Sequence, residues 1–220
     1  MPRSATAKRS LPPTAAGSGY HRGVADATQT DGLGRAGLYE RLVGDDWGEL
    51  DEPVRRFHTY DGELRGAGTF AVRRGAGRAA RLVARLLGLP EGGEAVPLLL
   101  SVERQAGGGE RWRRSFAGKD FITEQGEHAG RLMAERAGPF ELLYRLDAEG
   151  GALAYTQVGA ALRAGRVRLR LPRRLAPRVG ARERAAEGGE CVHVCVRVTS
   201  PLVGLVIEYE GRVRTEGEAG

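Results

Sequence analysis

The sequence predicts an α+β domain that is mostly antiparallel β. We expect a curved sheet or partly open barrel covered by one amphipathic helix, with short N-terminal helices before it. Two observations predict this fold. Apolar and polar residues alternate with period two along most of the chain, as in strands that bury one face. The predicted strands are short and recur about every 8–12 residues, which is typical of antiparallel barrels and sandwiches.

The chain begins with a segment that has no apolar periodicity. Residues 1–34 are rich in Pro, Ser, Thr, Ala and Gly, so we expect a disordered tail followed by a single globular domain over residues 35–220. Apolar residues then recur at helical spacing within residues 38–43, and Gly44 is a stop signal. Asp51 is placed to cap a second short helix.

The strongest helical signal is Arg78–Leu87, which Gly88 and Pro90 end. Its apolar residues share one side of the helix, and its three arginines lie on the other side. We expect the leucines of this helix to pack on the sheet. The residues of the apolar side are Ala79, Leu82, Val83, Leu86 and Leu87.

Most other segments are predicted strands, with hairpin turns at Gly107–Gly109 and Glu149–Gly151. Each strand has an apolar face made of every second residue. These faces are Leu64, Phe70 and Val72; Val96, Leu98, Leu100 and Val102; Trp112 and Phe116; Phe140, Leu142, Tyr144 and Leu146; Leu153 and Tyr155; Val167, Leu169 and Leu171; Val192, Val194, Val196 and Val198; and Val203, Leu205, Ile207 and Tyr209.

Composition excludes several classes of protein. The 220 residues are 41% hydrophobic and 28% charged, as in globular domains rather than disordered chains. No run approaches the ~18 apolar residues of a membrane-spanning helix. Two cysteines are too few for a disulfide scaffold. No apolar segment follows the basic residues near the N-terminus, so we expect no secretory leader and a cytoplasmic location.

Two stretches match the dinucleotide-binding pattern G-x-G-x-x-G/A, but neither has its structural context. The match at Gly32–Gly37 does not follow a strand. The match at Gly75–Ala80 follows Arg73 and Arg74, where the buried parallel strand of a nucleotide-binding fold would be apolar. We therefore expect no nucleotide cofactor.

Cys191, His193 and Cys195 resemble a metal-binding cluster in sequence. On a strand, however, alternate residues step by about 6.6–6.8 Å, which places the two cysteines about 13 Å apart. This separation is too long for one zinc ion or for a disulfide, whose Cα atoms lie within about 7 Å. We expect two free thiols and no metal.

His58 lies near Asp61, and such a pair can serve general acid–base catalysis. No serine or cysteine with a recognisable nucleophile motif accompanies it, so we predict no catalytic residues and expect His58 to cap a helix or face solvent. Four carboxylates among arginines are expected to form ion pairs on a solvated face. They are Glu103, Glu110, Glu124 and Glu183.

The segment Arg163–Arg184 holds nine arginines and a single acidic residue, Glu183. The chain has a net charge of +6, and 32 of its 34 basic residues are arginine. GC-rich coding alone would produce such an excess of arginine, so the net charge is only weak support for an anionic partner. The segment is either an anion-binding stripe or a solvated strand face paired with acids such as Glu183 and Glu208. Few aromatic residues accompany it, so we do not expect a nucleic-acid partner. The anion-binding candidates are Arg166, Arg168, Arg170, Arg173 and Arg174.

A series of motifs in a fixed order spans residues 36–214. It comprises Leu38–Trp47, Val54–His58, Val72–Gly75, Ala80–Leu89, Gly93–Pro97, Glu110–Trp112, Phe116–Gly118, Gly138–Phe140, Leu171–Val179 and Pro201–Leu205. This series resembles the bacterial family catalogued as domain of unknown function 4166, whose members have no established activity or catalytic residues. Fusion of some relatives to dehydrogenase-like nucleotide-binding domains implies a dehydrogenase-like partner protein. The family commonly has a phenylalanine in the strand matching Cys191–Val196, where this chain has valines, which implies a roomier interior.

Sheets that curve around apolar side chains enclose ligand-sized cavities. The leading hypothesis is therefore a non-enzymatic domain that binds a small, largely apolar ligand, for which an acidic head group is one option. The alternative is an interaction module that docks an oxidoreductase or an anionic surface through the arginines of residues 163–184. A hydrolase or reductase ranks third, because no motif supports it.

Overall fold

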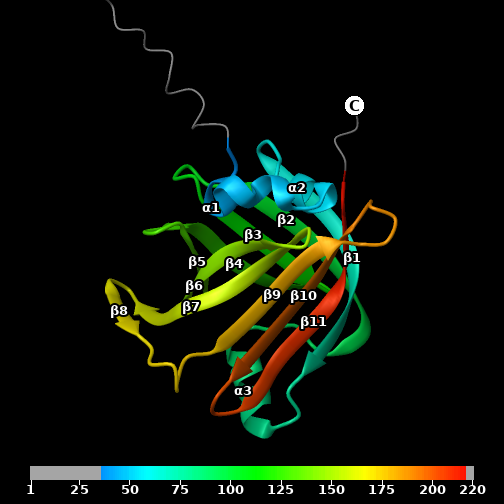
Figure 1. The fold of residues 1–220 in the computed structure, drawn as a ribbon. Coiled ribbons are helices and arrows are strands. Elements are labelled where there is room, and N and C mark those ends of the chain that lie inside the picture. The colour runs from blue at the N-terminus through cyan, green and yellow to red at the C-terminus, as the bar shows by residue number, and fades with distance from the viewer. Residues whose placement is uncertain (1–35, 217–220) are drawn as a thin grey trace, which may run out of the picture. The chain divides into compact units, whose positions relative to one another are not determined.

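The computed structural model describes residues 36–216, which form an antiparallel β-barrel with short helices at its two ends (Figure 1). Residues 1–34, predicted to be a tail, lie outside the described residues. The sheet order is β6-β5-β4-β3-β2-β1-β11-β10-β9-β7-β8, and the additional pairing of β6 with β7 closes ten strands into a ring. The prediction of mostly antiparallel β is confirmed, and the barrel is closed rather than partly open.

The helical elements are α1 (Leu38–Val43), the 3₁₀ helix η1 (Gly44–Glu49), α2 (Glu52–Phe57) and α3 (Arg78–Leu86). The strands are β1 (Glu63–Arg74), β2 (Gly93–Arg104), β3 (Glu110–Phe116), β4 (Lys119–His128), β5 (Leu132–Ala137), β6 (Phe140–Glu149), β7 (Ala152–Ala164), β8 (Val167–Arg170), β9 (Arg178–Ala185), β10 (Val192–Ser200) and β11 (Gly204–Thr215). The predicted stop at Gly44 is confirmed, with a φ of +69° that favours glycine.

The first and last strands, β1 and β11, pair along nine residues. Two glycines allow these strands to approach closely. A Cβ at Gly68 would lie 2.1 Å from the carbonyl oxygen of Arg212, and one at Gly211 would lie 2.3 Å from that of Thr69. Closure of the ring leaves fewer unpaired backbone groups at sheet edges than an open sheet would.

The core fills the barrel interior and contains the predicted apolar faces of most strands. Phe70, Val102, Phe116 and Ile207 are among its fully buried side chains. The prediction is wrong for β8, where Val167 and Leu169 are 67% and 61% exposed. This strand pairs only with the end of β7, outside the ring, and its apolar residues therefore have no core to face.

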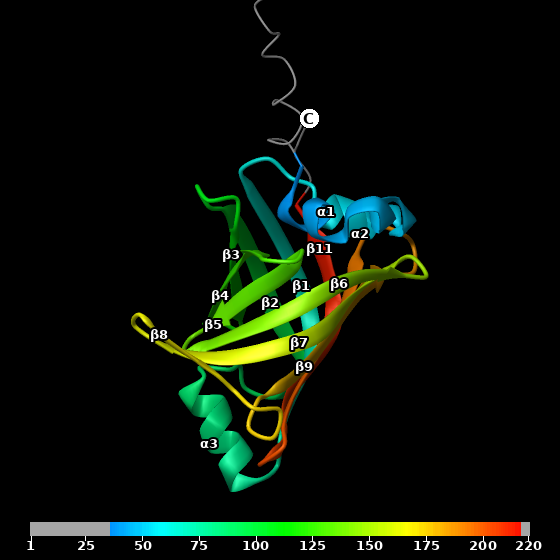
Figure 2. The same ribbon diagram turned by 60° about the vertical axis from the view of Figure 1, so that its left-hand side comes forward.

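Helices α1, η1 and α2 lie at one end of the barrel, and α3 lies at the other (Figures 1 and 2). The predicted helix at 78–87 is confirmed, but only part of its predicted apolar side is buried, because Val83 and Leu87 pack against the core whereas Leu82 does not. Ala80 and Ala84 are buried, whereas Leu82 is 55% exposed. The two alanines allow α3 to pack closely against β1 and β11.

Gly75 opens the turn between β1 and α3, in the second match to the dinucleotide pattern. A Cβ at this position would lie 1.8 Å from the carbonyl oxygen of Leu205 in β11. The glycine is therefore required by the close approach of two chain segments. The first match, Gly32–Gly37, lies mostly outside the described residues.

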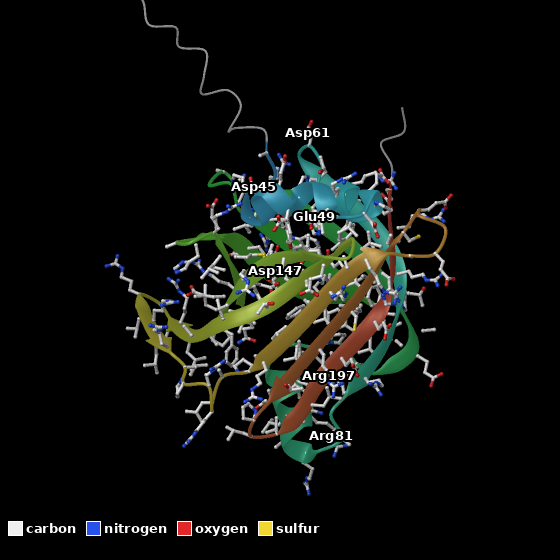
Figure 3. All side chains as sticks on the ribbon, viewed as in Figure 1. Asp45, Glu49, Asp61, Arg81, Asp147 and Arg197 are labelled. Carbon is white, nitrogen blue, oxygen red and sulfur yellow. The ribbon has the colours of Figure 1, made fainter. Side chains whose placement is uncertain are left out.

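The two ends of the barrel differ in charge (Figure 3). Residues 38–57, which form α1, η1 and α2, contain six acidic residues and three arginines. Residues 78–87, which include α3, contain three arginines and no acidic residue. Figure 3 shows Asp45, Glu49 and Asp61 at the α1–α2 end and Arg81 at the α3 end. No helix of the described residues is long and apolar enough to cross a membrane.

Candidate functional site

The barrel contains a cavity of about 220 Å³ that α3 helps to line. Most of the lining side chains are aliphatic or aromatic, and most come from strands of the barrel. They include Val196 and Val198 of β10, Val206 and Ile207 of β11, and Val83 of α3. The polar side chains that line the cavity are Thr123, Glu135, Tyr144, Ser200 and Tyr209.

A smaller chamber of about 60 Å³ adjoins this cavity. The two share lining residues, among them Glu135, Tyr144 and Val196. The smaller chamber is also lined by Arg114 and Glu183, so it is more polar than the larger one. The interior is therefore divided into an apolar part beside α3 and a polar part closer to α1 and α2.

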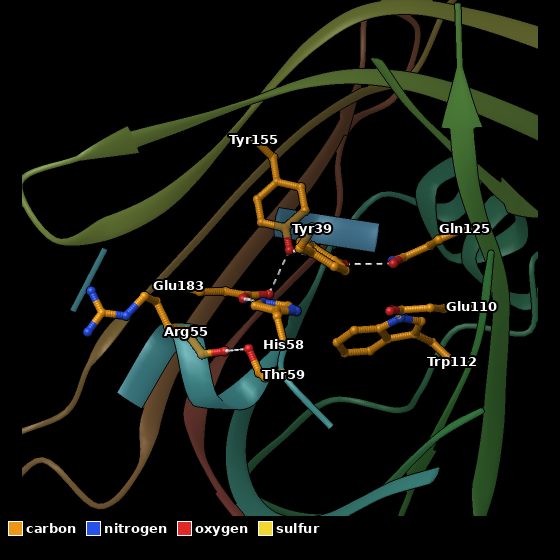
Figure 4. A network of polar contacts seen from close by, with 9 residues as sticks. All are labelled: Tyr39, Arg55, His58, Thr59, Glu110, Trp112, Gln125, Tyr155 and Glu183. Carbon is orange, nitrogen blue, oxygen red and sulfur yellow. Dashed lines mark hydrogen bonds and ion pairs between the residues drawn. The ribbon is translucent and has the colours of Figure 1, made fainter. Parts of the chain in front are cut away.

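A hydrogen-bond network crosses the polar part of the barrel (Figure 4). His58 Nε2 lies 2.6 Å from Glu183 Oε2, and the Tyr155 hydroxyl donates to Glu183 Oε1 at 2.9 Å. The Tyr39 hydroxyl donates to Gln125 Oε1 at 2.6 Å. Gln125 Nε2 donates in turn to Glu135 Oε1 at 3.2 Å, which extends the polar contacts to the edge of the apolar cavity.

The network joins the N-terminal helices to the barrel. His58 is the C-cap of α2, and its ring stacks on Tyr39 of α1 with centroids 3.7 Å apart. Both side chains are buried, and their partners Glu183 and Gln125 lie on β9 and β4. The helices are therefore held against the barrel by polar as well as apolar contacts.

Sequence reasoning missed most of this network. His58 lies at a helix C-cap, as one of the two expectations has it, but its side chain is buried rather than in solvent. Glu110 and Glu183 were expected on a solvated face, yet both are buried. The missed signal is alternation, because Glu110 is in phase with Trp112, and Glu183 with Ala181. The other two carboxylates, Glu103 and Glu124, are exposed as predicted.

The buried tyrosines remain protonated near neutral pH. Burial, together with the nearby Glu183 carboxylate, raises the pKa of Tyr39 and of Tyr155 well above the ordinary value. Burial raises the pKa of Tyr209 to about 12. These hydroxyls are therefore neutral hydrogen-bonding groups. The buried hydroxyl of Tyr144 has no hydrogen-bond partner among residues 36–216.

Arg114 is a cation that lines the smaller chamber. Its guanidinium donates to Thr123 Oγ1 at 3.0 Å and lies 4.8 Å from the ring centroid of Trp112. Within the described part of the chain it forms no ion pair. Three inward-facing carboxylates, those of Glu110, Glu135 and Glu183, lie in the same half of the barrel.

The candidate metal cluster does not form. Cys191 and Cys195 are free thiols on partly buried residues. The partner of His193 is a glutamate, because its Nε2 lies 3.0 Å from Glu210 Oε1. Across residues 36–216, no three His, Cys, Asp or Glu side chains are placed to hold a metal ion.

The arginine-rich segment divides into paired and unpaired residues. Arg163 and Arg168 both donate to Glu141, at 2.6 and 2.5 Å, and Glu141 is buried. Burial would raise the pKa of Glu141, but hydrogen bonds from the two arginines hold it below the ordinary value. The prediction that Glu183 pairs with the arginines of residues 163–184 is wrong, because the side chain of Glu183 faces the barrel interior. The remaining candidates, exposed and without an ion pair among the described residues, are Arg166, Arg170, Arg173 and Arg174.

Replacing Arg168 with glutamate is expected to lower the free energy of unfolding by about 2–3 kcal/mol, because a charged hydrogen bond is lost and a second carboxylate faces buried Glu141. The matched change Arg170→Glu should alter it by less than about 0.5 kcal/mol. Equilibrium urea denaturation measures both. Equal effects of the two substitutions would show that the Glu141 pair contributes nothing.

Comparison with known proteins gives a family but no activity. No curated protein matches the chain. A solved structure, a protein with unknown function from the DUF3598 family of Nostoc punctiforme, is 12% identical with a TM-score of 0.41. That match covers 70% of this chain and 47% of the Nostoc chain, so this chain spans about half of its length. The family model described as Domain of unknown function (DUF4166) matches residues 50–213. The chain therefore belongs to the DUF4166 family, as the order of its motifs predicted.

Proposed function

We propose that the protein binds one small, largely apolar molecule inside the barrel. The observation that carries this proposal is the cavity of about 220 Å³ lined by aliphatic and aromatic side chains. Cavities of this kind favour apolar ligands, because binding removes apolar surface from water without breaking hydrogen bonds of the protein.

The cavity volume limits the size of the ligand. An engineered cavity of about 150 Å³ binds benzene, so a volume of 220 Å³ fits a molecule of about nine or ten non-hydrogen atoms. This is smaller than the drug-sized ligands that fill pockets of about 300–1,000 Å³. We therefore propose a ligand with a single short chain or ring.

The polar lining favours a ligand whose polar group is neutral. Thr123, Glu135 and the unpartnered hydroxyl of Tyr144 line the same cavity. A ligand hydroxyl or carbonyl that reaches Tyr144 would satisfy this buried group, whose lack of a partner costs about 1–3 kcal/mol. The acidic head group considered from the sequence is less favourable, because the carboxylates of the interior outnumber Arg114.

Solvent extraction of the freshly purified protein tests this function. Mass spectrometry of the extract should find a small apolar molecule at up to one equivalent per chain. An extract of the Val196→Phe variant, whose larger side chain takes part of the cavity, should contain less of it. Identical extracts from the two proteins, together with no uptake of added n-octanol by the wild type, would refute the proposal.

A further inference from the structure

The exposed surface at the α3 end of the barrel combines arginines with apolar side chains. Its members come from residues 78–87, 171–177 and 200–203, and we call it the mouth surface. Its apolar residues are Leu82, Leu175 and Leu202, which are 55%, 52% and 70% exposed. Its basic residues are Arg78, Arg81, Arg85, Arg173 and Arg174.

The mouth surface lies beside the cavity. Leu175 lines the cavity and is also half exposed, so the cavity reaches the surface at this residue. Val83, which follows Leu82, and Ser200, at the start of the turn that holds Leu202, line the same cavity. Figure 2 shows β8, with its exposed Val167 and Leu169, on the same side of the barrel as α3.

The charge of this surface is one-sided. The three chain segments that form it contain five arginines and no aspartate or glutamate. The nearby Glu91 is paired with Arg74. The opposite end of the barrel carries the acidic residues of α1, η1 and α2 (Figure 3). Because the two ends of the barrel differ in charge, a negatively charged surface attracts the α3 end of the protein.

We infer that the mouth surface docks on anionic lipid membranes, which places the opening of the cavity against the bilayer. Arginines beside exposed leucines match such a surface, because the arginines reach lipid phosphates while the leucines enter the headgroup boundary. A highly charged soluble partner would not need the leucines. Exchange of the ligand with the bilayer rests on the proposed function, whereas docking itself does not.

Cosedimentation with phosphatidylcholine vesicles, prepared with and without phosphatidylserine, tests docking. The wild type should bind only the vesicles that contain phosphatidylserine, and less at about 500 mM than at about 50 mM salt. The double variant Arg81→Glu/Arg174→Glu should bind about 25-fold more weakly or worse, since each arginine contributes about fivefold and each glutamate adds repulsion. The control Arg111→Glu/Arg184→Glu makes the same charge change at exposed residues outside the mouth surface and should stay within about threefold of the wild type.

The leucines separate a membrane from other polyanions. The variant Leu82→Ser/Leu202→Ser should lose about tenfold or more in vesicle affinity while its retention on heparin is unchanged. Unchanged vesicle binding by this variant would mean that the surface recognises a soluble polyanion or an acidic protein, and would overturn the inference. Equal losses in the two arginine pairs, or no vesicle binding at low salt, would also overturn it.

Binding of n-octanol to the same proteins separates this inference from the proposed function. A wild type that binds vesicles but not n-octanol has a docking surface and no ligand site. A wild type that binds n-octanol but not vesicles retains the ligand site without the membrane surface.

Discussion

Replacing Val196 with phenylalanine is expected to lower the affinity for n-octanol about tenfold or more. Val196 of β10 lines both chambers of the interior. The larger side chain would take the space of about two ligand methylenes, each of which contributes about 0.8 kcal/mol when buried. The added ring enters existing space, so the free energy of unfolding should change little, unlike overpacking of a filled core. Isothermal titration calorimetry measures the affinity.

The matched control is Val158→Phe. Val158 lies on β7, is 49% exposed and does not line either chamber. The same change of residue type there should leave n-octanol binding unchanged. If Val196→Phe binds n-octanol as tightly as the wild type and Val158→Phe, the ligand does not occupy this cavity.

Replacing His58 with alanine is expected to lower the free energy of unfolding by about 3–5 kcal/mol, because it leaves Glu183 Oε2 buried without its partner and creates a cavity. The His58 side chain is fully buried, and that of Glu183 is 8% exposed. The stacked contact with Tyr39 is lost as well. The exposed His128 provides the control, and His128→Ala should change stability by less than about 0.5 kcal/mol.

A double-mutant cycle tests whether the effect comes from the pair. His58→Leu/Glu183→Leu should cost less than the sum of the two single substitutions, because it removes both polar groups together. Equilibrium urea denaturation gives the free energies. Additive effects would show that His58 and Glu183 stabilise the fold independently.

The strands could be predicted from the sequence because most of them bury one face. In β1, apolar residues at every second position mark the buried face, and in β10 the alternate residues Val194, Val196 and Val198 line the interior chambers. The same alternation misleads in β8, where Leu169 repeats the pattern without facing a core. Closure of the ring was not predictable, because β7 pairs with β6, β8 and β9 and these pairings depend on distant residues.

Helix α3 shows a different limit of prediction from the sequence. Its sequence holds two overlapping apolar stripes, one containing Leu82 and the other containing Ala80 and Ala84. Hydrophobicity alone predicts that Leu82 is buried, but close packing on β11 buries Ala80 and Ala84 beside Val83 instead. Leu82 is therefore exposed and belongs to the mouth surface, which could not be predicted from the sequence.

The candidate site was the hardest part to predict. Its apolar half follows from inward positions such as Val196 and Ile207, whereas its polar half depends on contacts between distant elements. His58 and Glu183 are 125 positions apart in the sequence. The charge of Glu183 predicts that its side chain faces solvent. Its position on β9, two residues from the inward-facing Ala181, instead places it inside the barrel. Alternation is therefore the better guide to the interior of this barrel, even for charged residues.

Calorimetric titration with straight-chain alcohols from n-butanol to n-dodecanol tests the central claim most directly. If the cavity of about 220 Å³ binds the ligand, affinity should rise about fourfold for each added methylene. It should then stop rising near n-octanol or n-nonanol, where the chain fills the available volume. No binding by any alcohol, or affinity that keeps rising through n-dodecanol, would contradict an apolar cavity of this size as the ligand site.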